Sequence, residues 1–92
     1  MEISFDPEKR AATLSERGLD FADAARVFEA PKFEFEDDRF DYPEVRWSTI
    51  GLLDDRMVVV IWTEAEGGRR VLSMRKANER EQARFGKRFA KD

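Results

Sequence analysis

The stretch from Arg56 to Ala77, which reads RMVVVIWTEAEGGRRVLSMRKA, decides the fold. Its first half is rich in β-branched and aromatic side chains, which pack well on the pleated surface of a β-sheet. Gly67 and Gly68 follow, and glycine adopts the positive φ angles of a tight hairpin turn at little cost. The second half begins and ends with basic residues. The stretch therefore predicts a β-hairpin with an apolar middle and a basic exit strand.

Two arginines of the exit strand, Arg70 and Arg75, are five positions apart. Successive side chains of a regular strand point to opposite faces, so these two would face away from each other. A β-bulge between them would re-aim one of the two. Either a bulge is present, or the two guanidinium groups serve different surfaces.

Before the hairpin, the sequence predicts an opening strand over residues 1–5 and then two helices. Asp6-Pro7-Glu8 combines an N-cap side chain, a proline at the first helical position and an early carboxylate, and Gly18 ends this helix. The second helix begins after Asp20 and ends at Pro31. Its core side chains repeat at helical spacing, and they are Phe21, Ala24, Ala25 and Phe28.

Two more strands and a last helix complete the prediction. An edge strand begins at Lys32, and another strand covers Val45–Leu53. The turns that join them to the hairpin are short, so neighbouring strands are antiparallel. A capping box formed by Asn78 and Glu81 opens the last helix. We therefore expect one α+β domain over residues 1–92, with two layers: a strand, two helices, a four-stranded antiparallel meander and a C-terminal helix.

Cysteine and histidine are both absent from the 92 residues. Disulfides and thiolate chemistry are therefore excluded, and zinc sites are normally built from these two residue types. The acidic cluster Glu36-Asp37-Asp38 is interpreted as a solvated loop, so we expect no metal and no cofactor. No apolar run is long enough to cross a bilayer, so we expect no membrane contact and a cytoplasmic location.

The net charge of −3 hides an uneven distribution of charge along the chain. Residues 1–68 hold 8 Lys and Arg against 17 Asp and Glu, whereas residues 69–92 hold 9 against 3. Such an asymmetry is typical of a protein whose basic end faces a polyanion. The alternative is that the basic end neutralises the acidic end within the fold.

Several segments of the chain resemble the BrnT toxins of bacterial type II toxin–antitoxin systems. These segments occur in the same order and with the same spacing over nearly the whole chain. The most specific segment is RVLSMRKA at Arg70–Ala77, followed by Glu81. The other similar segments are Phe5–Lys9, Gly18–Phe21, Ala24–Phe28 and Arg46–Gly51.

The resemblance implies a RelE-like ribonuclease fold and the cleavage of RNA to stop translation. It also implies a BrnA-type antitoxin that neutralises the toxin, carries the DNA-binding part and represses the operon together with the toxin. The chain departs from the residues usual in the family at three places. Thr13 stands in place of Asn, Glu16-Arg17 in place of Lys-His, and Phe85 in place of Tyr.

Metal-independent RNA cleavage requires a base for the 2′-hydroxyl, cations that stabilise the phosphorane and an acid for the leaving 5′-oxygen. Guanidinium groups suit the phosphorane because they remain charged and bind phosphate with two hydrogen bonds. Arg70 and Arg75, which match the family motif, and Arg84, which precedes Phe85, are the candidates for this role. Glu64 is the candidate base, or it orients Arg70 across the hairpin. The alternative is an ordinary cross-strand ion pair between Glu64 and Arg70.

Four further cations are the candidates for RNA binding, and they are Lys9, Arg46, Lys76 and Arg80. Lys9 and Lys76 would also serve as proton donors if burial or neighbouring cations favour their neutral form. Arg46 suits either a phosphate or the antitoxin.

Three functions therefore remain open. The first is a ribonuclease toxin restrained by an antitoxin, for which Glu64, Arg70 and Arg84 should line one groove. The second is a catalytically impaired homologue that still binds its antitoxin, because the family's His and Tyr are replaced. The third is a non-enzymatic nucleic-acid-binding module that uses the basic tail.

Overall fold

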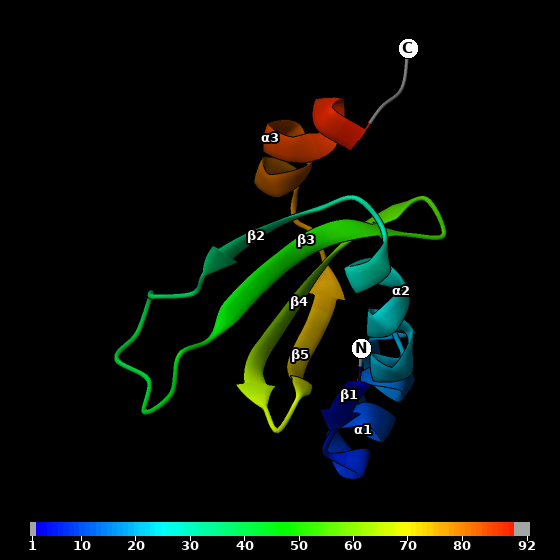
Figure 1. Ribbon diagram of the computed structural model, residues 1–92. Helices are drawn as coiled ribbons and strands as arrows, with labels where there is room; N and C mark the ends of the chain where they lie inside the picture. The colour runs from blue at the N-terminus through cyan, green and yellow to red at the C-terminus, as the bar shows by residue number, and fades with distance from the viewer. Residues whose placement is uncertain (1, 90–92) are drawn as a thin grey trace.

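The computed structural model describes residues 2–89 and contains a five-stranded sheet with helices on both faces (Figure 1). Residue 1 and residues 90–92, which include Lys91 of the basic tail, lie outside the described residues. In chain order the elements are β1 (Glu2–Phe5), α1 (Pro7–Arg17), the 3-10 turn η1 (Phe21–Asp23), α2 (Ala24–Glu29), β2 (Lys32–Glu36), β3 (Trp47–Leu53), β4 (Arg56–Ala65), β5 (Gly68–Lys76) and α3 (Glu79–Phe89).

The predicted hairpin is confirmed as β4 and β5, joined by a turn at Glu66 and Gly67. Gly67 has a φ angle of +79°, as expected for a tight turn. Gly68 is required for a different reason. A Cβ atom at this position would collide with the backbone carbonyl of Glu2, because β1 runs directly alongside. Only glycine therefore allows β1 to pair with the start of β5.

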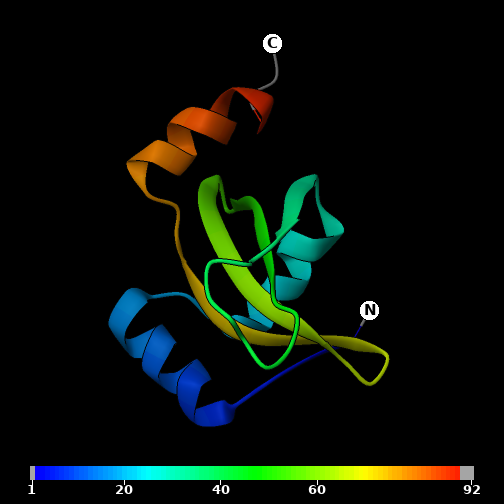
Figure 2. The same cartoon turned by 90° about the vertical axis from the view of Figure 1, so that its left-hand side faces the viewer.

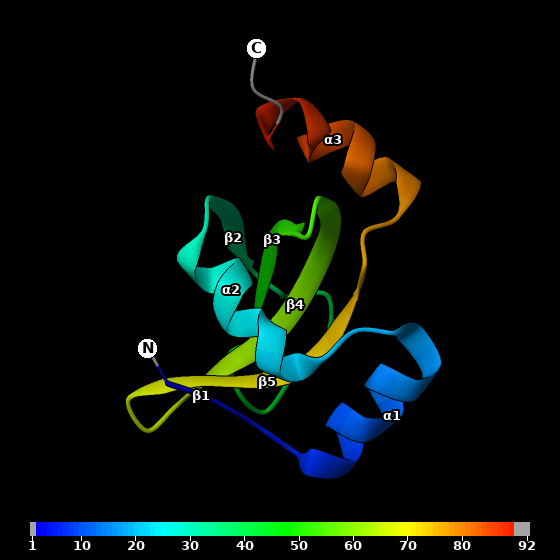
Figure 3. The ribbon, with the colours of Figure 1, turned by 90° about the vertical axis from the view of Figure 1, so that its right-hand side faces the viewer.

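The strand order is β1-β5-β4-β3-β2, and the predicted antiparallel meander of β2 to β5 is confirmed. β1 adds to it in parallel with β5, so the sheet is mixed. The expectation of two layers was wrong. α2 packs against β3 on one face (Figure 3), whereas α3 lies apart from α1 and α2 and packs on the opposite face (Figure 2). The apolar side chains of the sheet are therefore divided between two cores.

The larger core lies between the sheet and α2, on what we call the α2 face. It contains Phe21, Val27 and Phe28 from η1 and α2, and Val58, Val60, Trp62 and Met74 from the strands. The smaller core lies on the α3 face, where Phe85 packs against Phe33 with ring centroids 5.1 Å apart. Alternation along β4 assigns its side chains to the two cores in turn, because successive residues point to opposite faces.

A β-bulge interrupts β5 at Leu72. Ile61 pairs with Ser73 and Trp62 pairs with Val71, so two steps along β5 match one step along β4. Such a bulge changes which face the following side chains occupy. Arg70 pairs with Thr63, and Arg75 pairs with Val59, and both partners point to the α3 face. The bulge therefore places Arg70 and Arg75 on the same face.

The helix ends follow the predicted capping residues. The Asp6 and Asp20 carboxylates accept hydrogen bonds from the amides two residues later, each 2.9 Å long. Gly18 has a φ angle of +70°. The capping box is also confirmed, with hydrogen bonds of 2.9 and 2.8 Å between Asn78 and Glu81. One expectation for the loops was wrong, because Asp37 of the acidic cluster is buried and not solvated.

Candidate functional site

The structure does not bring Glu64 and Arg70 together. Glu64 pairs with Arg69, whereas Arg70 pairs with Thr63, so the two side chains lie on opposite faces of the sheet. The expectation that Glu64 orients Arg70, and the alternative of a cross-strand ion pair between them, were therefore both wrong. Glu64, Arg70 and Arg84 do not line one groove: Glu64 borders a hollow at the hairpin turn, and Arg70 borders another beside β1.

Arg75 lies on the α3 face and is engaged by a carboxylate. Its guanidinium donates two hydrogen bonds to Glu81, each 2.8 Å long. These bonds hold the pKa of Glu81 below its ordinary value, and they raise the pKa of Arg75. The positive charge of Arg75 is therefore neutralised within the fold. For this residue, the structure favours the alternative in which basic residues of the C-terminal part form ion pairs inside the domain.

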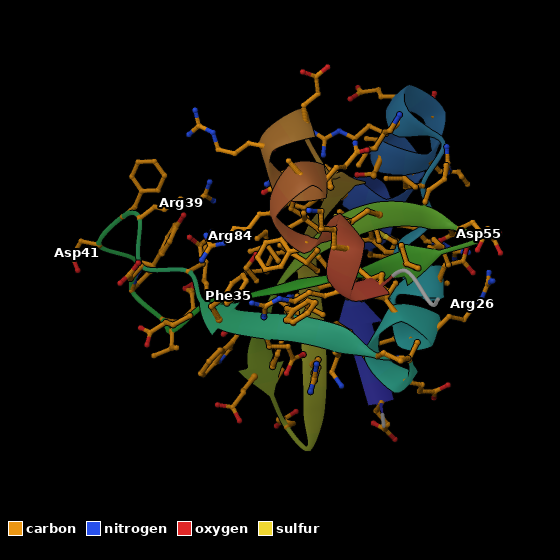
Figure 4. The ribbon with its side chains drawn as sticks, turned by 90° about the horizontal axis from the view of Figure 1, so that it is seen from above. Arg26, Phe35, Arg39, Asp41, Asp55 and Arg84 are labelled. Atoms are coloured by element: carbon orange, nitrogen blue, oxygen red, sulfur yellow. The ribbon has the colours of Figure 1, made fainter. Side chains whose placement is uncertain are left out.

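The two candidate arginines of α3 lie on its solvent-exposed surface. The Arg84 guanidinium lies over the ring of Phe85, 5.2 Å from its centroid, and Phe85 in turn contacts Phe35. Figure 4 shows Arg84 and Phe35 on the same side of α3. Arg80 is exposed in the first turn of the helix. Both cations are exposed to a partner, but neither lines any of the five hollows found in the described part of the chain.

The other two predicted RNA-binding cations are separated from these. Lys9 is exposed near the start of α1. Arg46 lies 4.1 Å from the centroid of the Tyr42 ring and donates a 2.8 Å hydrogen bond to Glu44. The charge of Arg46 is therefore partly offset by a neighbouring carboxylate.

A different cluster of cations surrounds a cavity where α1 ends beside β4 and β5. Arg17, Arg56 and Lys76 line this cavity, which has a volume of 280 Å³ and which we call the cation pocket. Its floor is apolar, because Leu19 and Val58 are almost completely buried. Among residues 2–89, six arginines form ion pairs with carboxylates, and Arg17 and Arg56 are not among them. Three cations without an ion pair in the described part of the chain surround this cavity, and such an arrangement favours an anion.

The backbone of β5 holds Arg17 in this position. β1 pairs with β5 only from Gly68 to Val71, so the outer edge of β5 beyond this point is unpaired in the described part of the chain. Arg17 fills part of that edge by donating a 3.0 Å hydrogen bond to the carbonyl oxygen of Met74. The left-handed residue Gly18 turns the chain immediately afterwards. The guanidinium is thereby fixed, and its remaining N–H groups are available to a ligand.

The geometry of the cation pocket suits a phosphate group. Guanidinium groups bind phosphate oxygens with paired hydrogen bonds, and an ammonium group adds a compact positive charge. The apolar floor excludes water from one side, which strengthens each of these interactions. A phosphodiester of RNA combines such an anionic centre with apolar faces of sugar and base.

Two of the eight predicted site residues, Arg75 and Lys76, line the cation pocket from adjacent positions of β5. Arg17 and Arg56 were missed. The sequence distinguishes Arg17 only as the residue that replaces a His of the family, whereas the structure places it in one cavity with Lys76. Arg56 gave no signal in the sequence beyond its place at the start of a strand.

Within residues 2–89, no group of three or more carboxylates is close enough to hold a metal ion. None of the helices in this part of the chain is long and apolar enough to cross a membrane.

A protein-family model with the description "Ribonuclease toxin, BrnT, of type II toxin-antitoxin system" matches residues 5–81. The match includes the three cations of the cation pocket and ends before Arg84. No curated protein matches the chain.

Proposed function

Because the chain belongs to the BrnT family of ribonuclease toxins from type II toxin–antitoxin systems, we propose that it cleaves RNA without a metal ion and is neutralised by a BrnA-type antitoxin. In this proposal the cleavage stops translation in the cytoplasm. The toxin–antitoxin complex represses its own operon, and the antitoxin makes the contacts with operator DNA. A RelE-like arrangement of the fold belongs to the same proposal.

The cation pocket is the single observation that carries this proposal. During cleavage the 2′-oxygen attacks phosphorus, the bond from phosphorus to the 5′-oxygen breaks, and negative charge accumulates on the phosphoryl oxygens. Arg17, Arg56 and Lys76 surround a space of 280 Å³ and have no partner carboxylate among the ion pairs of the described residues. Cations fixed before the reaction stabilise this charge without reorganising.

The proton transfers of the reaction require a base and an acid. Lys76 is the candidate that donates a proton to the 5′-oxygen, because it shares the cation pocket with two guanidinium groups. Glu64 could act as the base only if the reacting phosphate lay at the hairpin turn and not in the cation pocket, because a base must be within hydrogen-bond reach of the 2′-hydroxyl. Glu64 lies near the opposite end of β4 from Arg56, about 25 Å away at the rise of a β-strand. Arg70 and Arg84 are proposed to hold the flanking phosphates on the α3 face.

A second candidate function is a catalytically impaired homologue that mainly binds its antitoxin. The observation that favours it is the engagement of Arg75, the motif arginine, by two 2.8 Å hydrogen bonds from its guanidinium to Glu81. An arginine held in this way must leave its carboxylate before it contacts a phosphorane, and that rearrangement costs rate.

Expression of the chain alone and together with the product of the adjacent gene separates the two functions. A ribonuclease toxin stops growth and fragments total RNA when expressed alone, and co-expression restores both. An impaired homologue leaves growth and RNA intact yet co-purifies with the neighbouring product. Addition of EDTA to the purified protein then tests whether cleavage needs a metal.

The variant Lys76→Ala connects the activity to the cation pocket. Removal of one stabilising cation is expected to lower the cleavage rate about 10²-fold to 10³-fold. The matched control is Lys87→Ala, which removes an exposed lysine of α3 that does not line the cation pocket. Equal loss in both variants would show that the total charge, and not the cation pocket, determines cleavage.

A further inference from the structure

The coil between β2 and β3, residues 37–46, exposes large apolar side chains. Phe40 is 67% exposed and Val45 is 52% exposed, and Phe35 at the end of β2 is 38% exposed. Figure 1 shows this coil projecting beyond the sheet, and Figure 4 shows Asp41 at its outer end. Exposed apolar groups gathered in one projecting segment are typical of an interaction surface. We call residues 37–46 the aromatic loop.

The aromatic loop is held in place at its base. The buried carboxylate of Asp37 accepts hydrogen bonds of 2.8 and 3.1 Å from Arg39, which hold the pKa of Asp37 below its ordinary value. The Asp37 amide donates a 2.7 Å hydrogen bond to the carbonyl of Arg46 and closes the loop. Thr63 of β4 donates another of 2.7 Å to the carbonyl of Val45. These hydrogen bonds hold the backbone that carries the exposed side chains in one conformation.

The interior of the aromatic loop forms a ready-made recess. Residues 36–46 surround a hollow of 510 Å³. Phe40 and Tyr42 meet edge to face with centroids 5.8 Å apart, and the Arg46 guanidinium lies over the Tyr42 ring. A surface that is ordered before binding loses little conformational entropy when a partner arrives. Exposed aromatic residues on such a surface commonly provide most of the binding energy.

The charge of the aromatic loop indicates the chemistry of its partner. Residues 36–46 contain five acidic and two basic residues. Both arginines are occupied by ion pairs, with Asp37 and with Glu44. The remaining acids, Glu36, Asp38 and Asp41, form no ion pair within the described part of the chain. This negative surface repels RNA and attracts a basic protein segment.

We infer that the aromatic loop is the docking surface for a basic, amphipathic segment of the antitoxin. This inference rests on the proposed function, because it names how the partner of the toxin is recognised. Apolar side chains of the antitoxin pack on Phe40 and Val45, and its Lys or Arg residues face Asp38 and Asp41. The aromatic loop adjoins the start of β3, whereas Arg56 pairs with the last residue of β3. Arg75 connects the two regions, because it borders a hollow together with Asp37, Asp38 and Arg39 and also lines the cation pocket.

Binding of the purified antitoxin encoded beside this chain tests the inference. Phe40→Ala combined with Val45→Ala should weaken binding about tenfold or more, because both side chains provide buried apolar area only in the complex. Asp38→Asn combined with Asp41→Asn should weaken binding at low salt and flatten its salt dependence. The control is Leu14→Ala, which removes an exposed apolar side chain of α1 and should leave binding unchanged.

RNA cleavage and thermal unfolding of the same variants separate this inference from the proposed function. Phe40→Ala with Val45→Ala should melt like the wild type and cleave RNA at the same rate. Wild-type-like antitoxin binding by this variant would overturn the inference, as would a loss of RNA cleavage with antitoxin binding retained. If the wild type cleaves no RNA, the proposed function fails, and the binding measurement still decides the role of the aromatic loop.

Discussion

The guanidinium of Arg75 donates two hydrogen bonds of 2.8 Å to the carboxylate of Glu81, and the same carboxylate accepts a 2.9 Å hydrogen bond from the Asn78 amide. Glu81 thus closes the capping box of α3 and ties that helix to β5. One side chain therefore fixes the first turn of α3 and also the angle at which the helix leaves the sheet.

Glu81→Gln should destabilise the fold in a pH-dependent way. The pKa of Glu81 lies below its ordinary value of 4.5, mainly because Arg75 bonds to the charged form. A lowered pKa stabilises the fold at pH values above the unfolded pKa, and this stabilisation disappears as the pH falls through the folded pKa. We expect Glu81→Gln to lower the free energy of unfolding by about 1 kcal/mol at pH 7.

Urea denaturation at pH 7 and at pH 3 measures this effect. The difference between the wild type and Glu81→Gln should shrink as the pH falls through the folded-state pKa of Glu81, because protonation removes the charged acceptor of the Arg75 hydrogen bonds. Glu79→Gln is the control, since Glu79 is an exposed acid in the same helical turn without an ion pair among residues 2–89. An equal pH dependence in both variants would contradict the assignment to the Arg75–Glu81 pair.

Gly68→Ala should detach β1 from the sheet. A Cβ atom at position 68 would collide with the backbone carbonyl of Glu2, which cannot move without breaking the parallel pairing. We expect a loss of about 1–3 kcal/mol in the free energy of unfolding, as for other overpacked positions. Amide hydrogen exchange should also accelerate selectively in residues 2–5.

Gly86→Ala provides the matched comparison. A Cβ atom at Gly86 meets no other heavy atom within 4 Å, and the residue lies inside α3. The substitution should therefore raise the free energy of unfolding by about 0.5–1 kcal/mol, because alanine loses less backbone entropy than glycine in a helix. If Gly68→Ala were as stable as Gly86→Ala, β1 would not depend on the close approach at Gly68.

Local signals in the sequence were sufficient for most of the elements. Asp6-Pro7 with Gly18 set the ends of α1, and the run from Val58 to Trp62 set β4, because capping and β-propensity act over a few residues. The side of the sheet on which α3 packs was not predictable in this way. It depends on contacts between Phe85 and Phe33, which are far apart in the chain.

The candidate site was harder to predict than the fold. The motif identified Arg75 and Lys76, but it did not show the position of the bulge at Leu72. This bulge places Arg70 and Arg75 on the same face of the sheet. No local pattern connects Arg17 with Lys76, because the hydrogen bond from Arg17 to Met74 spans 57 positions. Cross-strand register and long-range contacts depend on how distant segments pack together, and a single sequence contains no local pattern that reports them.

Thr49→Val should destabilise the α2 face although it preserves the shape of the side chain. Thr49 is completely buried, and its hydroxyl accepts a 2.7 Å hydrogen bond from the Trp62 indole and donates another of 2.7 Å to Glu34. Valine would leave the indole N–H buried without a partner. Such a loss costs about 1–3 kcal/mol, measured as the free energy of unfolding.

Tryptophan fluorescence during denaturation reports this change directly, because Trp62 stacks on Trp47 with centroids 6.0 Å apart. The control is Thr13→Val on α1, where the threonine is half-buried and no side-chain hydrogen bond is formed among the described residues. Glu34→Gln should give a smaller loss than Thr49→Val, since its amide oxygen can still accept from the hydroxyl. The reverse order would show that the charge of Glu34 and not the Thr49 hydroxyl holds the network.

Arg17→Ala should reduce RNA cleavage about 10²-fold to 10³-fold with little change in the melting temperature. The side chain is exposed, and its one hydrogen bond within the fold goes to the Met74 carbonyl, which water can satisfy after the substitution. Arg17→Lys should lie between the wild type and Arg17→Ala, because an ammonium group keeps the charge but cannot bind phosphate through a planar pair of N–H groups.

Cleavage of a labelled RNA by these variants, compared with Arg84→Ala, decides between the two faces of the sheet. If the cation pocket holds the reacting phosphate, Arg17→Ala loses far more activity than Arg84→Ala, whose guanidinium lies on α3 beside Phe85. The opposite ranking would place the reaction on the α3 face, which carries Arg70 and Arg75 of the family motif. RNA binding as a function of salt concentration gives a second measurement. Loss of one phosphate contact should reduce the slope of log K against log salt by about 0.7.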